Sequence, residues 1–115
     1  MDRGALDALI ARAMRSDPAN VRRFELCTPY SRPGISFDMK HCVTTYEVSV
    51  AGFLLVLRRA RMVEERADQP PQRSDRYVLQ VYAGEEQLMR QEGDAARDIY
   101  ERCESVHSRV EAKVL

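Results

Sequence analysis

The run Val48–Leu57, which reads VSVAGFLLVL, is the feature that most constrains the fold. A helix that crosses a bilayer needs about 20 consecutive apolar residues. This run has ten residues and contains Ser49 and Gly52. Read at a period of two, it forms two alternating segments around Ala51-Gly52, a dipeptide suited to a two-residue hairpin loop. The sequence therefore predicts a β-hairpin, with no membrane anchor.

A loop at Ala51-Gly52 also predicts the register of this hairpin. Such a loop pairs apolar residues across the two strands: Val50 with Phe53, Val48 with Leu55, and Tyr46 with Leu57. A slip of one residue would turn Glu47 and Ser49 into the core instead. In the predicted register, Leu54 and Val56 point to the opposite face of the sheet.

The remaining segments predict an α+β fold. An N-terminal helix at residues 4–15 is followed by strands at about 21–28 and 35–39, a turn containing Pro33-Gly34, and the hairpin at 43–62. We expect a mobile loop at 63–75, strands at 76–82 and 87–91, and a C-terminal helix. That helix would start with Asp94 as its N-cap and would bury Ala96, Ile99, Cys103, Val106 and Val110. The expected architecture is an antiparallel meander of four to five strands, with both helices packed on one sheet face.

Length and charge limit the functional classes. A chain of 115 residues is suited to one domain, here residues 1–115. Its 18 basic and 18 acidic residues cancel, whereas a general nucleic-acid binder carries a basic excess. A neutral chain also has little charge repulsion to keep it monomeric. Almost all basic residues are arginines, a bias that a GC-rich bacterial genome produces without selection for function.

The three cysteines, Cys27, Cys42 and Cys103, do not form a secreted disulfide framework, because their number is odd and their spacing irregular. The first residues lack the apolar segment of a signal peptide, so we expect a cytoplasmic protein. Cys103 and His107, at i and i+4, could share a metal ion with Cys27 and His41-Cys42. However, no short CxxC spacing supports this, and buried structural cysteines explain the pattern more simply.

No sequence motif indicates catalysis. A Cys–His nucleophile pair would lack a group that orients the base, and the phosphate-binding, nucleophile-elbow and zincin motifs are missing from the sequence. We therefore expect a protein that is not an enzyme and has no catalytic residues, cofactor or metal. No motif identifies a family whose functional residues could be transferred.

Two surfaces remain as candidates. The second sheet face would carry Leu54, Val56, Val78 and Tyr82, and an exposed apolar patch of this kind marks an interface with another protein. We expect the partner to be a second copy, bound through this face or through a sheet edge. The alternative is nucleic-acid or anionic-ligand binding by an arginine-rich rim comprising Arg58, Arg59, Arg61 and Arg76. Acidic residues interleave with these arginines, so a salt-bridged rim explains them better and we do not expect nucleic acid as the partner.

Overall fold

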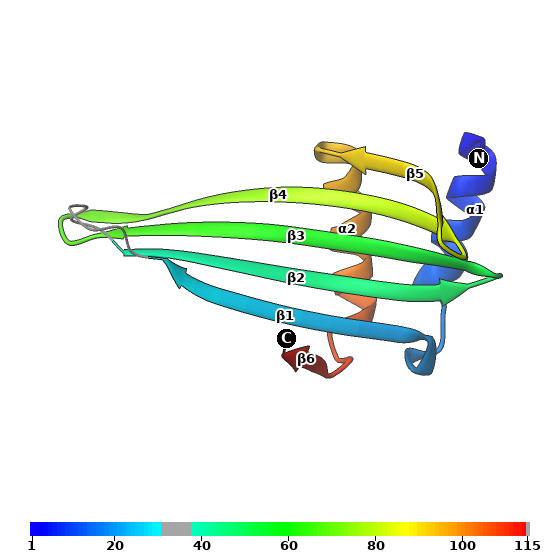
Figure 1. The fold of residues 1–115 in the computed structure, drawn as a ribbon, viewed down its shortest axis with the longest axis horizontal. Helices are drawn as coiled ribbons and strands as arrows, with labels where there is room; N and C mark the ends of the chain where they lie inside the picture. Colours follow the sequence, from blue (N-terminus) through cyan, green and yellow to red (C-terminus); the bar gives the residue numbers. More distant parts are fainter. Residues whose placement is uncertain (31–37, 115) are drawn as a thin grey trace.

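The structure, a computed structural model, describes residues 1–30 and 38–114 (Figure 1). In the described residues, two α-helices and a sheet form an α+β fold, as the sequence predicts. The sheet has six strands, whereas the sequence predicted a meander of four to five. The elements in chain order are α1 (Arg3–Met14), η1 (Pro18–Asn20), β1 (Val21–Tyr30), β2 (Asp38–Val50), β3 (Phe53–Arg66), β4 (Gln69–Ala83), β5 (Glu86–Glu92), α2 (Asp94–His107) and β6 (Ala112–Val114). The predicted turn at Pro33-Gly34 and the predicted strand residues 35–37 lie outside the described residues.

The sheet has the strand order β5-β4-β3-β2-β1-β6. From β1 to β5, consecutive strands are antiparallel neighbours. After α2 the chain returns to the sheet, and β6 pairs in parallel with residues 23–25 of β1. The sequence did not predict β6, because three residues are too few to show a periodicity.

The hairpin of β2 and β3 has the predicted register. Val50 pairs with Phe53, Val48 with Leu55, and Tyr46 with Leu57. At the turn, Ala51 has a φ of 51° and Gly52 a φ of 81°. A type I′ hairpin turn requires positive φ at both central residues. The apolar run at the centre of the sequence is therefore sheet, and neither described helix is long and apolar enough to cross a membrane.

The prediction of a mobile loop at residues 63–75 is wrong. β3 continues to Arg66, the turn is at residues 67–68, and β4 begins at Gln69. Pro70 and Pro71 are tolerated because β5 pairs with β4 only from Val78 to Ala83. Among the described residues, the first half of β4 therefore has a neighbour on its β3 side only. Between the pairs Glu64–Gln72 and Arg66–Gln69, β4 has one residue more than β3. Both prolines lie in this bulge and have no partner in the register, so their missing N–H groups break no regular pair of the ladder.

One face of the sheet and the two helices enclose the core. Six sheet residues in it are fully buried: Tyr46, Val48, Leu55, Leu57, Leu79 and Val81. They form one cluster with residues of both helices, namely Leu6, Leu9, Ile10 and Ala13 of α1 and Ala96, Tyr100 and Cys103 of α2. In Figure 1 the helices lie behind the sheet, and β3 and β4 extend well beyond α2. We call the side with the core the helix face, and the other side the open face.

The buried stripe of α2 differs from the predicted one. Ala96 and Cys103 are buried as predicted, but Val106 is 53% exposed. Tyr100 and His107 are buried in its place, because the helix is rotated so that Tyr100 faces the sheet. A tyrosine gives a large apolar surface despite its hydroxyl, which a pattern based on aliphatic residues underestimates.

The predicted N-cap of α2 is also wrong. The N-cap is Gly93, with a φ of 86°, and no side chain caps the helix. Asp94, the predicted cap, is the first residue of the helix. Its negative charge there still interacts favourably with the positive end of the helix dipole.

Candidate functional site

The four residues predicted as an interface lie together on the open face. Strand residues alternate between the two faces of a sheet, and the register places Leu54 opposite Tyr82. Val56 is two positions along β3 and only 5% exposed, while Leu54, Val78 and Tyr82 are half-buried. Their shared position agrees with the expectation. Their role as an interface stays a prediction.

Five further apolar residues extend this surface, and sequence reasoning missed them. Leu26 pairs with Val43, which pairs with Ala60 across the next strand. Leu26 and Met62 are 42% and 37% exposed. With Phe24 they continue the apolar surface towards the far end of the sheet. We call the nine residues the open-face stripe: Phe24, Leu26, Val43, Leu54, Val56, Ala60, Met62, Val78 and Tyr82. Extending the hairpin register back from the turn would have found Val43 and Ala60.

Several polar side chains on the open face bind one another. The Arg58 Nε donates to Thr45 Oγ1 at 3.3 Å. Gln80 and Tyr82 both donate to Gln87 Oε1, at 3.0 and 3.3 Å. Because Gln80 and Tyr82 are partnered within the face, a second apolar surface could cover them at little desolvation cost. The charged Arg58 has only a neutral partner here, so it would have to stay in contact with water.

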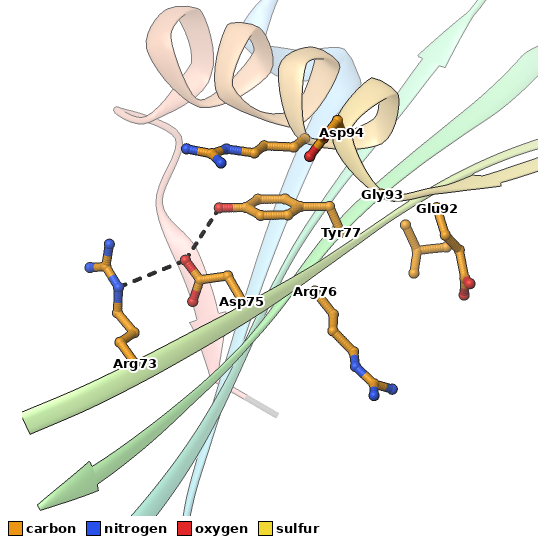
Figure 2. A pocket seen from close by; sticks show the side chains of 9 residues that line it. Arg73, Asp75, Arg76, Tyr77, Glu92, Gly93 and Asp94 are labelled. Atoms are coloured by element: carbon orange, nitrogen blue, oxygen red, sulfur yellow. Dashed lines mark hydrogen bonds and ion pairs between the residues drawn. The ribbon is translucent and has the colours of Figure 1, made fainter.

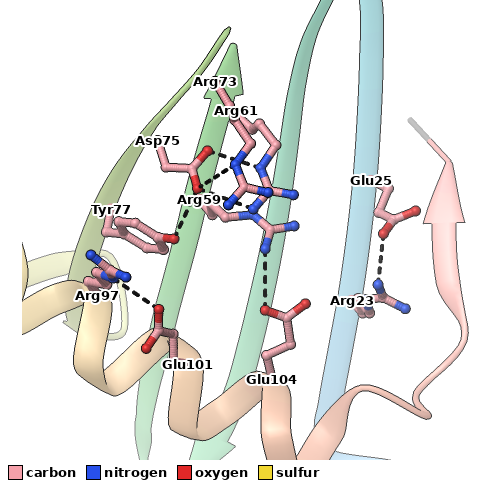
Figure 3. Close-up of polar contacts among 10 residues, drawn as sticks. All are labelled: Arg23, Glu25, Arg59, Arg61, Arg73, Asp75, Tyr77, Arg97, Glu101 and Glu104. Carbon is pink, nitrogen blue, oxygen red and sulfur yellow. Dashed lines mark hydrogen bonds and ion pairs between the residues drawn. The ribbon is translucent and has the colours of Figure 1, made fainter. Parts of the chain in front are cut away.

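The helix face carries a charged network beyond the core (Figure 3). The Arg61 Nε and Nη2 donate to the two carboxylate oxygens of Asp75 at 2.9 and 3.1 Å. The Tyr77 hydroxyl donates to Asp75 at 3.3 Å, and Arg73 lies 3.8 Å from it. The hydrogen bond from Arg61 lowers the pKa of Asp75, and burial raises the pKa of Tyr77. This part of the sheet is held by side chains that neutralise each other.

Two more arginines are tied to buried tyrosines. Arg59 lies 3.4 Å from Glu104 of α2, and its guanidinium carbon is 5.2 Å from the centre of the Tyr100 ring. Arg23 binds Glu25 at 2.7 Å and lies 5.7 Å from the centre of the Tyr46 ring. Both distances are within the range of cation–π attraction. Through these contacts, Arg59 and Arg23 stabilise the packing of α2 and β1 against the core. Their positive charges are compensated by Glu104 and Glu25.

The hydroxyls of Tyr46 and Tyr100 are buried without a hydrogen-bond partner among the described residues. The rings meet edge to face, with centroids 5.7 Å apart. Burial raises the pKa of Tyr46 to about 12, and it raises the pKa of Tyr100 as well. The pair contributes apolar contact to the core at the cost of two unsatisfied polar atoms.

The four arginines predicted as an anion-binding rim do not share one surface. Arg59 and Arg61 lie on the helix face and bind acids. By the alternation of β3 and β4, Arg58 and Arg76 lie on the open face. Figure 2 shows the side chain of Arg76 pointing away from Asp75 and Tyr77. The prediction that these arginines converge is therefore wrong, because neighbouring residues of a strand point to opposite sides.

A pocket of about 820 Å³ lies at the N-terminus of α2 (Figure 2). Its charged lining consists of three arginines and three acids: Arg73, Arg76, Arg97, Asp75, Glu92 and Asp94. Arg97 is bound to Glu101 at 2.9 Å. Since the opposite charges balance, the lining does not select for an anion or a cation. We assign no ligand to this pocket.

The cysteines and histidine considered as metal ligands do not converge. Cys27 and Cys42 face each other across β1 and β2 and form a disulfide. The expectation of buried structural cysteines is wrong for Cys27, which is exposed. The β1–β2 register, which the sequence did not predict, brings it together with Cys42. Cys103 is free and buried. His107 Nε2 donates to the carbonyl oxygen of Ala13 at 3.0 Å and joins α2 to α1. No group of three potential metal-binding side chains occurs in residues 1–30 and 38–114.

Of the surfaces described above, the open-face stripe is the one whose exposed side chains are apolar and lack contacts that satisfy them within the described chain. The charged network and the pocket are compensated by their own residues, whereas the stripe presents apolar area that neither described helix covers. Comparisons of the chain with protein-family models, with curated proteins and with solved structures found no match.

Proposed function

We propose that this protein is a non-enzymatic interaction module that self-associates through its open face. The observation that carries the proposal is the open-face stripe, nine apolar residues on a face opposite the core. The proposal takes residues 1–115 as one cytoplasmic domain with both helices on the helix face. Contiguous exposed apolar patches larger than a few hundred Å² usually mark an interaction site.

The size of the stripe suits a small dimer interface. It spans four strands, or roughly 19 Å at about 4.8 Å per strand. From Leu54 to Met62 it runs eight residues along β3, or roughly 26 Å at about 3.3 Å per residue. The projected area of the stripe is then about 500 Å² per copy. This value treats the surface as flat and leaves out the extra area of protruding side chains. Two copies would together bury about 1,000 Å², which is the lower limit for a biological interface, so the stripe suits a weak dimer.

Charge favours a second copy as the occupant. The chain has a net charge of zero, so two copies approach without overall repulsion. On the open face, Arg22 and Glu47 neutralise each other at 2.7 Å. Two Arg58 side chains would repel each other across a two-fold axis, so we place the axis nearer to Val56. The two sheets would then pack face to face, with the same residues contributed by each copy.

The test is sedimentation of wild-type protein and two matched variants at high micromolar concentration. Leu54→Glu introduces a charge within the stripe, where it would be buried in the dimer. Val106→Glu introduces the same charge at the exposed apolar position of α2, away from the open face. We expect the wild type and Val106→Glu to be dimers and Leu54→Glu to be a monomer. Circular dichroism confirms that each variant is folded.

Three outcomes would contradict the proposal. A wild-type protein that remains a monomer at high micromolar concentration has no self-association to explain. A dimer that survives Leu54→Glu but dissociates in Val106→Glu uses α2 and not the open face. Capture of a different protein by monomeric wild type would assign the stripe to another partner and would overturn self-association.

A further inference from the structure

The Cys27–Cys42 disulfide lies on the helix face, beyond the core. The two residues are direct partners in the β1–β2 register, with Cα atoms 4.1 Å apart. This spacing corresponds to the close, non-hydrogen-bonded pair of an antiparallel ladder, in which side chains approach each other most nearly. Cys27 is exposed and Cys42 is half-buried. A thiol in solution can therefore reach the bond from the Cys27 side.

The surroundings of the two sulfurs differ. Arg61 is the partner of Cys42 on β3 and points to the same face. Cys27 lies one strand further away, on β1, so Cys42 is the cysteine nearer to the charge of Arg61. The bidentate contact with Asp75 holds Arg61 in place and partly offsets its charge. A nearby cation stabilises a thiolate, so Cys42 is the better leaving group.

We propose that Cys27–Cys42 is a thiol–disulfide exchange site that reacts with a small-molecule thiol of the glutathione class. The thiolate attacks the exposed Cys27 sulfur, a new sulfur–sulfur bond forms to the small molecule, and the Cys42 sulfur, the nearer of the two to Arg61, leaves as a thiolate. A second thiolate attacks the sulfur of the bound small molecule and releases Cys27 as a thiolate. Two small-molecule thiols are oxidised to one disulfide, and their two protons pass to Cys27 and Cys42.

The fold is suited to repeated opening and closing of this bond. β1 and β2 pair continuously from Val21–Val48 to Tyr30–Met39, so backbone hydrogen bonds hold the two cysteines opposite each other after reduction. Cys103 is fully buried, and burial raises the pKa of its thiol to about 12. It is therefore neither exposed nor ionised enough to compete for the exchange. The proposal does not depend on self-association.

The first experiment equilibrates folded wild-type protein with reduced and oxidised glutathione at varied ratios. Acid quenching, alkylation and intact mass then give the redox state. We expect a reversible two-electron transition that persists in Cys103→Ser and is lost in Cys27→Ser. Rapid alkylation during reduction should trap glutathione on Cys27 and the alkyl group on Cys42. Three free thiols at every ratio would overturn the site, and glutathione trapped mainly on Cys42 would overturn the assigned direction of attack.

The second experiment tests the role of Arg61 with variants of opposite effect. Arg61→Gln removes the cation and should slow the reduction by about threefold, since exchange is faster when the leaving thiol has a lower pKa. Asp75→Asn leaves the charge of Arg61 uncompensated and should accelerate it by a similar factor. Arg76→Gln, a change of equal charge on the open face, should leave the rate unchanged. Equal rates in Arg61→Gln and Asp75→Asn would refute a role for this cation.

Discussion

Removing the Cys27–Cys42 disulfide should lower the free energy of unfolding by about 3 kcal/mol. The bond joins residues 15 positions apart. The chain-entropy model assigns a closed loop of that length about 10 cal/mol/K, or about 3 kcal/mol at 25 °C. For 115 residues, an unfolding entropy of about 2.1 cal/mol/K per residue converts this into a fall in Tm of about 12 °C.

Thermal and urea unfolding can measure this change. Oxidised wild type is compared with the reduced protein and with a double variant, Cys27→Ser with Cys42→Ser, all at one protein concentration because association shifts Tm. The reductant should have no effect on the double variant, which serves as its control. Identical unfolding midpoints for oxidised and reduced wild type would show that the bond does not constrain the unfolded chain, and the reasoning would fail.

Three other predictions concern buried polar groups. Tyr46→Phe removes a hydroxyl that has no partner in the described structure, so urea unfolding should show a gain of about 1 kcal/mol, and a loss would indicate a hidden hydrogen bond. His107→Ala breaks the contact with the Ala13 carbonyl and leaves a cavity, so stability should fall by about 2–4 kcal/mol; an unchanged urea midpoint would contradict this. Burial raises the pKa of the Cys103 thiol from 9.0 to about 12, so on raising the pH the unfolded state loses this proton before the folded state does. The free energy of unfolding should therefore decrease as the pH rises from 9 towards 12. In urea unfolding across that range, the midpoint should decrease less for Cys103→Ala than for the wild type.

The central hairpin could be predicted because its register has only one solution that buries apolar residues. A slip of one residue would turn Glu47 and Ser49 inward, and the two-residue loop at Ala51-Gly52 excludes larger slips. Leu54 and Val56 were then placed on the open face by the same alternation. This part of the candidate site follows from local sequence alone.

The rest of the site depended on pairings that local sequence does not determine. The first half of β4 is polar on both sides, so the alternation that identifies a half-buried strand is missing there. The turn predicted at Pro33-Gly34 did not give a register for β1 and β2, so the opposition of Cys27 to Cys42 could not be derived. Without that register, Leu26 could not be placed beside Val43. In β3, Arg58 lies on the open face and Arg59 and Arg61 lie on the helix face, so these neighbours in sequence do not share a surface.

Pro70 and Pro71, which lie where β4 has no outer neighbour, also affect how the chain can polymerise. A strand with unpaired backbone groups can accept a strand from another molecule, and such additions can repeat to give a fibril. Neither proline has an N–H to donate to an incoming strand. Since consecutive residues of a strand direct their N–H groups to opposite edges, the ladder of a growing fibril would be broken at one of the two positions. These prolines should therefore keep the protein soluble at concentrations where a bare strand of the same length would seed aggregation.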